Sequence, residues 1–229
     1  IVPAHGGGYE LHKGVDAHKD QSYVLHMLDQ EHLAHTLLPL GGLSKAEVRA
    51  LAAQLGLPVA QRHDSQDLCF LAGEDYRNFI RRNAVEMLVP GEIVRRTGEV
   101  LGQHTGLPNY TIGQRKGLGI AYPEPLYVLG KDAAANRLVV GTADELGQRQ
   151  LLAANVTWTA GILPGEPFRA EVKIRYSARP APAWVTPLDN GARARVVFDA
   201  PVRDITPGQA AVFYNGDVVW GGGVIASGL

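Results

Sequence analysis

The sequence contains a single cysteine, Cys69, among its 229 residues. One cysteine cannot close a disulfide within the chain or build a multi-thiolate zinc site, and it indicates a protein of the reducing cytoplasm. The sequence also lacks an apolar run near the roughly 20 residues that a membrane-spanning helix needs, so we expect no membrane partner. Its first residues, "IVPAHGGGYELHKG", contain neither the pattern of a secretory signal nor an initiator Met. We therefore expect the chain to begin part-way through a longer protein.

Neither sign of charge is in excess, because 22 basic and 23 acidic residues give a net charge of −1. This balance argues against a nonspecific nucleic-acid coat. Basic residues nevertheless gather locally, as in "RRN" at 81–83, in "GQRKGLG" at 113–119 and in the pair Arg175 and Arg179. The sequence is therefore compatible with an RNA partner that contacts one face of the fold.

Three regions with different patterns divide the chain. Residues 1–84 carry helix signals, above all "SKAEVRALAAQLGLP", where Ser44 and Glu47 have the spacing of a capping box. "YELHKG" suits a strand, and "DQSYVLHML" and "EDYRNFIRR" suit helices. Residues 85–150 contain two hairpin patterns, "GEIVRRTGEVLGQH" and "LYVLGKDAAANRLVVG". Residues 151–229 alternate at period two in "FRAEVKIRY", "ARARVVFD", "QAAVFYN" and "VVWGGGVI", which predicts a small antiparallel β-barrel. The predicted fold class is α+β and multidomain.

The stretch "RHDSQDLCFL" leaves two interpretations of Cys69 open. Free cysteine is among the most frequently buried residue types, which favours an inert core thiol. Asp64 and Asp67 would discourage a thiolate unless Arg62 or His63 turns toward the sulfur. The local sequence alone therefore favours a structural role.

Patterns that could indicate a metal or nucleotide site are weak. His26, His32 and His35 lie close together without an HExxH motif or a cysteine partner, so we expect no metal site. The glycine runs at 6–8 and 221–223 match no phosphate-binding motif, and a turn or bulge is the better interpretation.

The loop "YTIGQRKGLGI" has two interpretations. Gln114, Arg115 and Lys116 place amide, guanidinium and ammonium donors side by side, and the glycines would let the backbone approach a phosphate. A solvated turn between hairpins explains the same residues. "KDQSY" at 19–23 likewise suits a helix start with Asp20 as the cap.

Taken together, "VDAHKDQSYVL", "LGGLSKAEVRALAAQLGLPVAQRHDSQDLCFL", "GEIVRRTGEVLGQHTGLPNYTIGQRKGLGI" and "ITPGQAAVFYNGDVVWGGGVI" resemble the bacterial tRNA-specific 2-thiouridylases in order and spacing. The resemblance runs over essentially all 229 residues. It implies three parts: residues 1–84 as the C-terminal end of an α/β ATP-pyrophosphatase-like domain, residues 85–150 as a central β-rich domain, and residues 151–229 as a tRNA-binding β-barrel.

The resemblance also implies a reaction, in which sulfur replaces O2 of the wobble uridine in the tRNAs for Lys, Glu and Gln. The family uses ATP with Mg²⁺ to activate that oxygen, and an upstream donor delivers sulfur as a cysteine persulfide. Cys69 matches the persulfide-carrying cysteine, because a persulfide is more acidic and more nucleophilic than its parent thiol. A second cysteine would release the sulfur by forming a disulfide. This match reverses the interpretation of Cys69, from an inert thiol to a catalytic one.

Matched position by position, several residues correspond to tRNA contacts of the family. They are Lys19, Asp20 and Gln21 near the N-terminus, Arg175 and Tyr176 after a barrel strand, and Gln209. Their chemistry suits RNA, since Lys and Arg bind phosphates, Gln binds base edges or sugar hydroxyls, and Tyr stacks on bases. Arg115 and Lys116 are predicted as further backbone contacts on their chemistry.

The chain departs from the family in one respect. The SGGxDSS-like pyrophosphate loop and the first catalytic cysteine are absent, so we expect this chain alone to bind no ATP and to complete no turnover. Two rival functions remain open: a non-catalytic RNA-binding β-barrel with a structural cysteine, and an interaction scaffold that binds no RNA.

Overall fold

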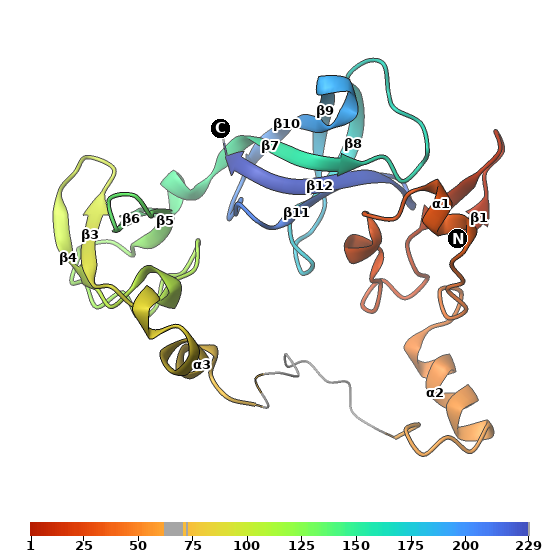
Figure 1. Ribbon diagram of the computed structural model, residues 1–229, viewed down its shortest axis with the longest axis horizontal. Coiled ribbons are helices and arrows are strands. Elements are labelled where there is room, and N and C mark those ends of the chain that lie inside the picture. Colours follow the sequence, from red (N-terminus) through yellow and green to blue (C-terminus); the bar gives the residue numbers. More distant parts are fainter. Residues whose placement is uncertain (62–70, 72, 229) are drawn as a thin grey trace. The chain divides into compact units, whose positions relative to one another are not determined.

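A computed structural model describes residues 1–61, 71 and 73–228 of the chain, without the side chains of residues 227 and 228. The chain forms two compact units (Figure 1). One combines Ile1–Arg62 with Gln148–Leu229, and the other is His63–Gly147. Cys69 lies outside the described residues.

The N-terminal segment of the first unit contains short strands and helices. They are β1 (Val2–Pro3), β2 (Tyr9–His12), the 3-10 helix η1 (Ser22–Leu25), α1 (Gln30–Ala34) and α2 (Lys45–Gln54). The predicted capping box of α2 is confirmed, since the Ser44 side chain accepts from the Glu47 amide and the Glu47 side chain accepts from the Ser44 amide. The residues predicted to begin a helix at "DQSYVLHML" form the single 3-10 turn η1, which is shorter than the pattern suggested.

Six strands of the same unit close into an antiparallel barrel (Figure 1). They are β7 (Gln148–Thr157), β8 (Phe168–Lys173), β9 (Ala181–Leu188), β10 (Arg193–Val202), β11 (Ala210–Asn215) and β12 (Val218–Gly228), with the 3-10 turn η6 (Asp189–Gly191) between β9 and β10. Their order is β12-β11-β8-β9-β10-β7, and β12 pairs again with β7. Alternate side chains point inward, as Ala170, Val172 and Ile174 do on and just after β8, and they fill a buried core. The predicted β-barrel is confirmed.

The N-terminal strand β2 extends this sheet, because β12 pairs with β2 along its first residues and with β7 along its later ones. Leu11 faces Val219 across the β2–β12 pair, and both side chains are fully buried. Leu33 of α1 and Tyr23 of η1 pack into the same cluster. This apolar contact fixes residues 9–34 on the outside of the barrel, an arrangement that the sequence did not predict.

The second unit is built on a four-stranded sheet. Its elements are α3 (Tyr76–Asn83), η3 (Val85–Met87), β3 (Gly91–Arg95), β4 (Val100–His104), η4 (Leu107–Asn109), β5 (Tyr127–Asp132), β6 (Arg137–Gly141) and η5 (Ala143–Leu146). Both predicted hairpins are confirmed, β3 with β4 and β5 with β6. The parallel pairing of β3 with β6 joins them into one sheet with the order β4-β3-β6-β5. Ile93, Val128, Leu138 and Val140 form its fully buried centre.

The architecture confirms the predicted α+β multidomain fold class. In the described part of the chain, no helix has the length and apolar character needed to cross a membrane.

Candidate nucleic-acid interface

The segment from Gly14 to Gln21, between β2 and η1, is organised by two aspartates. Asp16 accepts from the amides of His18 at 3.1 Å and Lys45 at 3.0 Å. The bond from the Lys45 amide is the main reason that the pKa of Asp16 lies below its usual range. Asp16 therefore ties this loop to the first residue of α2.

Asp20 holds the second half of the loop. Its Oδ1 accepts from the amides of Gly14 at 2.9 Å and Ser22 at 3.1 Å, and its Oδ2 accepts from the Ser22 hydroxyl at 2.8 Å. Lys19 and Gln21, on either side, are exposed. Two of the three predicted contact residues in "KDQ" thus face solvent, and the carboxylate between them is used within the loop.

Tyr23, in η1 directly after this loop, brings the segment against the residues that follow β8. The Tyr23 and Tyr176 rings meet edge to face, with centroids 6.4 Å apart. The Lys173 ammonium lies 5.8 Å from the Tyr23 ring centroid and 5.5 Å from that of Tyr176. Burial raises the pKa of Tyr23 in spite of the nearby Arg175, so its hydroxyl stays protonated at neutral pH. Lys173 therefore lies over two aromatic rings, a cation–π arrangement.

A third segment, residues 206–210, completes this cluster. Arg175 donates to the Thr206 hydroxyl at 2.7 Å and lies 4.0 Å from a carboxylate oxygen of Asp204. The Tyr23 hydroxyl donates to the carbonyl oxygen of Ala210 at 2.9 Å. The neighbouring Gln209 is exposed, as is Tyr176.

The structure thus brings together three distant stretches of sequence, each of which carries predicted contact residues of the first unit. We call the described residues 19–23, 173–176 and 206–210 the basic-aromatic cluster. It offers cations for phosphates, exposed aromatic surface for stacking, and an amide for base edges or sugar hydroxyls.

Sequence reasoning missed Tyr23 and Lys173. A signal for Lys173 exists in the sequence, because the period-two alternation of "FRAEVKIRY" places residues 173 and 175 on the same side of an expected strand. In the structure β8 ends at Lys173, and Arg175 lies in the turn that follows. Tyr23 could not be found from its pattern, since its two partners, the ring of Tyr176 and the carbonyl of Ala210, are distant in sequence.

His26 anchors the end of η1 against the barrel. Its ring Nδ1 lies 2.9 Å from the carbonyl oxygen of Tyr23, and its own carbonyl accepts from the Thr159 hydroxyl at 2.8 Å. Burial lowers the pKa of His26, because the protonated ring is poorly solvated there.

We expect this burial to make the stability of the first unit depend on pH. The folded-state pKa lies below the unfolded value of about 6.5, so protonation favours the unfolded state and stability is lost as pH falls below that value. Urea unfolding at pH 7.5 and 5.5 measures this loss. His26→Gln should show a smaller drop between the two, and an equal drop in both proteins would contradict the role of His26.

Arg115 and Lys116 lie in the second unit, on the loop between η4 and β5. Both are exposed. The Gln114 side chain shapes this loop by accepting from the Thr111 amide at 2.9 Å and donating to the Lys116 carbonyl at 2.9 Å. Arg115 also lines an open groove of about 600 Å³ that continues to Leu126. These two predicted contacts thus form a basic surface of their own unit.

No group of three or more His, Cys, Asp or Glu residues in the described part of the chain is arranged to hold a metal ion. His32, one of the three clustered histidines, instead pairs with the neighbouring Asp29 at 2.6 Å.

Comparison with known proteins identifies the family. Three family models match the chain in order: a tRNA methyl transferase HUP domain at residues 3–73, a tRNA methyl transferase PRC-barrel domain at 77–142, and an aminomethyltransferase β-barrel domain at 148–225. Proteins called tRNA-specific 2-thiouridylase MnmA are similar over nearly the whole chain. Those of Heliobacterium modesticaldum, Symbiobacterium thermophilum and Geotalea uraniireducens are 49%, 51% and 52% identical over 97%, 96% and 96% of it.

Together with the fold, these matches define a class of multidomain protein with a HUP domain, a PRC-barrel domain and a C-terminal β-barrel. Within it, the chain belongs to the family of bacterial tRNA-specific 2-thiouridylases. The chain spans 58%, 56% and 58% of the length of these three relatives.

Proposed function

We propose that the chain is part of a tRNA uridine 2-sulfurtransferase that thiolates the wobble uridine, residue 34 in tRNA numbering. The relatives are named for 2-thiolation of tRNA. In this proposal the basic-aromatic cluster binds the tRNA, and Cys69 carries the sulfur that an upstream persulfide donor supplies. The tRNAs for Lys, Glu and Gln are the proposed substrates.

The observation that carries the proposal is the meeting of three segments at one surface. Lys173 and Arg175 provide two cations next to the exposed ring of Tyr176, and Gln209 lies beside the carbonyl that holds Tyr23. Single-stranded RNA is recognised by this combination of stacking surfaces and phosphate-binding cations. Lys19 and Gln21, two exposed residues of the loop before Tyr23, are proposed to bind the same tRNA. Arg115 and Lys116 provide a second basic surface in the central unit.

For the sulfur step we propose that the terminal sulfur of a Cys69 persulfide attacks C2 of the uridine. A C2–S bond would then form as the C2–O2 bond breaks, and O2 would depart as an oxygen of AMP after adenylation, which is the activation that the family uses. A second thiol of the whole protein attacks the sulfur of Cys69, breaks the S–S bond and leaves a disulfide, which a thiol reductant must reduce before the next turnover.

The family uses ATP with Mg²⁺ to make that oxygen a leaving group, but the described residues do not fit a nucleotide. Phosphates commonly bind at helix N-termini. In the described chain each α-helix has a carboxylate there: Asp29 at α1, Glu47 at α2 and Asp75 at α3. These carboxylates already accept from the backbone amides and would repel a phosphate. We therefore assign none of the described residues to ATP.

The rival function is an RNA-binding module without catalysis. Measuring tRNA affinity against salt concentration separates both RNA-binding functions from an interaction scaffold. A protein that uses several Lys and Arg contacts must lose affinity steeply as salt rises.

We expect Arg175→Ala to weaken tRNA binding by about 10-fold, because it removes a charge-assisted contact. A plot of the logarithm of the binding constant against the logarithm of the salt concentration should also become less steep, with its slope smaller in magnitude by about one. Filter binding or fluorescence anisotropy at several salt concentrations measures both effects.

Arg169→Ala is the matched control. Arg169 is an exposed arginine of β8 that is paired with Asp199 at 2.6 Å, outside the basic-aromatic cluster. It should bind tRNA as the unmodified protein does. An unchanged dissociation constant for Arg175→Ala would count against the proposed interface.

A further inference from the structure

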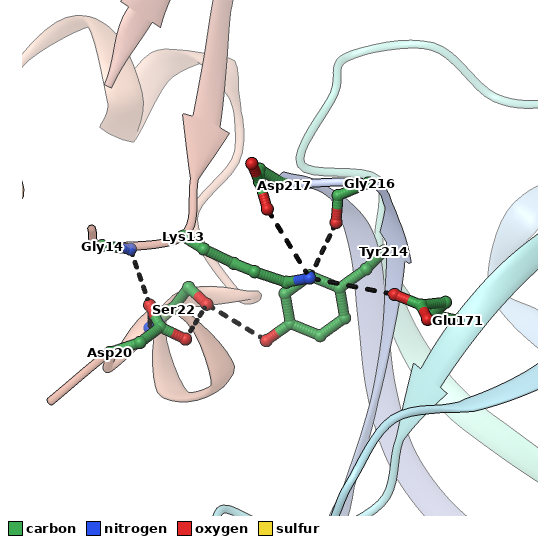
Figure 2. A network of polar contacts seen from close by, with 8 residues as sticks. All are labelled: Lys13, Gly14, Asp20, Ser22, Glu171, Tyr214, Gly216 and Asp217. Carbon is green, nitrogen blue, oxygen red and sulfur yellow. Dashed lines mark hydrogen bonds and ion pairs between the residues drawn. The ribbon is translucent and has the colours of Figure 1, made fainter. Parts of the chain in front are cut away.

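Asp20 is linked through Ser22 to Tyr214, a buried tyrosine of β11 that is distant in sequence. The Tyr214 hydroxyl lies 3.1 Å from Ser22 Oγ, and Ser22 Oγ lies 2.8 Å from Asp20 Oδ2 (Figure 2). Tyr214 is 1% exposed and Ser22 3%. Neither side chain can therefore touch a bound RNA.

The direction of these hydrogen bonds follows from their chemistry. An ionised carboxylate only accepts, so the Ser22 hydroxyl must donate to Asp20. With its proton used there, Ser22 Oγ accepts from the Tyr214 hydroxyl. Burial raises the pKa of Tyr214 to about 12, which keeps this donor protonated at any pH at which the protein is handled. The chain of donors runs from Tyr214 through Ser22 to Asp20.

Lys13 lies over the ring of Tyr214. Its ammonium donates to the Gly216 carbonyl at 2.7 Å and lies 4.7 Å from the ring centroid (Figure 2). Glu171 at 3.9 Å and Asp217 at 4.0 Å balance its charge. The tyrosine is thus fixed between a cation and a hydroxyl, and the ring cannot easily turn its donor away from Ser22.

The carboxylate of Asp20 is consequently committed to the protein. It accepts from two backbone amides and one hydroxyl, which leaves little capacity for a further partner. A carboxylate aimed at RNA would also be repelled by the phosphates, whereas a satisfied, buried network makes the backbone rigid. The rigid backbone is the one that presents Lys19 and Gln21.

We propose that Asp20 is a positioning residue, which acts with Ser22, Tyr214 and Lys13 to orient the loop that carries Lys19 and Gln21, and that it does not contact the RNA. This inference rests on the proposed function, since it presupposes that the loop binds tRNA. It assigns roles to three residues, Lys13, Ser22 and Tyr214, that the sequence did not nominate.

The test is a double-mutant cycle on tRNA affinity in the whole protein. Tyr214→Phe removes only the hydroxyl, and we expect a loss of about 3- to 10-fold. Lys19→Ala with Gln21→Ala removes the presented side chains. In the Tyr214→Phe background, this pair should cost much less than it does in the unmodified protein, because the side chains are no longer held in place. Ser22→Ala should lower tRNA affinity by as much as Tyr214→Phe does. The double variant should lose no more affinity than either single variant.

Tyr9→Phe is the control. Tyr9 lies on β2 of the same unit, and its hydrogen bonds to Gln30 use only backbone atoms, so affinity should not change. Thermal unfolding of each variant shows whether a loss of affinity follows from a loss of fold.

The outcomes separate the two proposals. If the unmodified protein binds no tRNA, the proposed function fails. If it binds and Tyr214→Phe binds equally well, or if the losses simply add, the positioning role is wrong while tRNA binding stands. A Lys19 and Gln21 pair without effect in the unmodified protein would also overturn the positioning role, because nothing would then be positioned.

Discussion

Replacing Cys69 with serine is expected to abolish tRNA thiolation by the whole protein while leaving its affinity for tRNA unchanged. A serine oxygen cannot carry sulfur as a persulfide, so we expect no residual thiolation through the persulfide route. Removal of a nucleophile costs other enzymes about 10⁶-fold in rate, and a loss of at least about 10³-fold is expected here. The measurement is 2-thiouridine content of tRNA after single turnover, next to a binding titration with the same samples.

The single cysteine makes a second measurement unambiguous. Because Cys69 is the only thiol in this chain, a persulfide formed on any fragment of it must lie at that residue. Intact mass after treatment with a persulfide donor should show one added sulfur, and Cys69→Ser should show none. Ser65→Ala, four residues away, is a matched control that should thiolate normally. Thiolation that survives in Cys69→Ser would leave only the RNA-binding function.

Local sequence patterns predicted the elements whose stability is local. The helix α2 begins where Ser44 and Glu47 satisfy each other's backbone amides, an interaction contained within four residues. The hairpins β3–β4 and β5–β6 join strands that are adjacent in the chain, with short turns between them. In such elements the residues that determine the structure are neighbours, so their pattern is visible in the sequence.

Two barrel strands were missed for identifiable reasons. The strand β9 contains Pro182 and Pro187, and proline lowers the expectation of a strand because it cannot donate to the sheet. The strand β7 starts at Gln148, at the boundary where the hairpin region was expected to end. The pairing of β2 with β12 joins residues about 200 positions apart, and no local pattern encodes such a contact.

The same distinction applies to the candidate site. Resemblance to the family nominated Arg175, Tyr176 and Gln209, and residue type added only that cations, aromatic rings and amides suit RNA. The contact of Tyr23 with Tyr176 and the bond between Ser22 and Tyr214 depend on the tertiary fold. The sequence could therefore suggest which side chains bind, but not which side chains hold them.

Replacing Gly222 with alanine is expected to destabilise the first unit and also to weaken tRNA binding. A Cβ at this position of β12 would lie 2.8 Å from the carbonyl oxygen of Ala211 and 2.7 Å from the His26 ring. Backbone cannot move cheaply, so we expect a loss of about 1–3 kcal/mol in the free energy of unfolding. His26 ends η1, and Ala211 follows the residue that holds the Tyr23 hydroxyl, so the strain reaches the basic-aromatic cluster.

Two other glycines separate the effect on stability from the effect on the site. A Cβ at Gly223 would lie 2.6 Å from the Ala154 carbonyl and 2.8 Å from Val156, both on β7 and away from η1. Gly223→Ala should therefore destabilise the unit by a similar amount, yet bind tRNA normally at temperatures where it is folded. Gly165→Ala has open space around its Cβ and should change neither property. Equal losses of tRNA affinity in Gly222→Ala and Gly223→Ala would mean that barrel stability alone governs binding, and that the contact of η1 with β12 does not position the cluster.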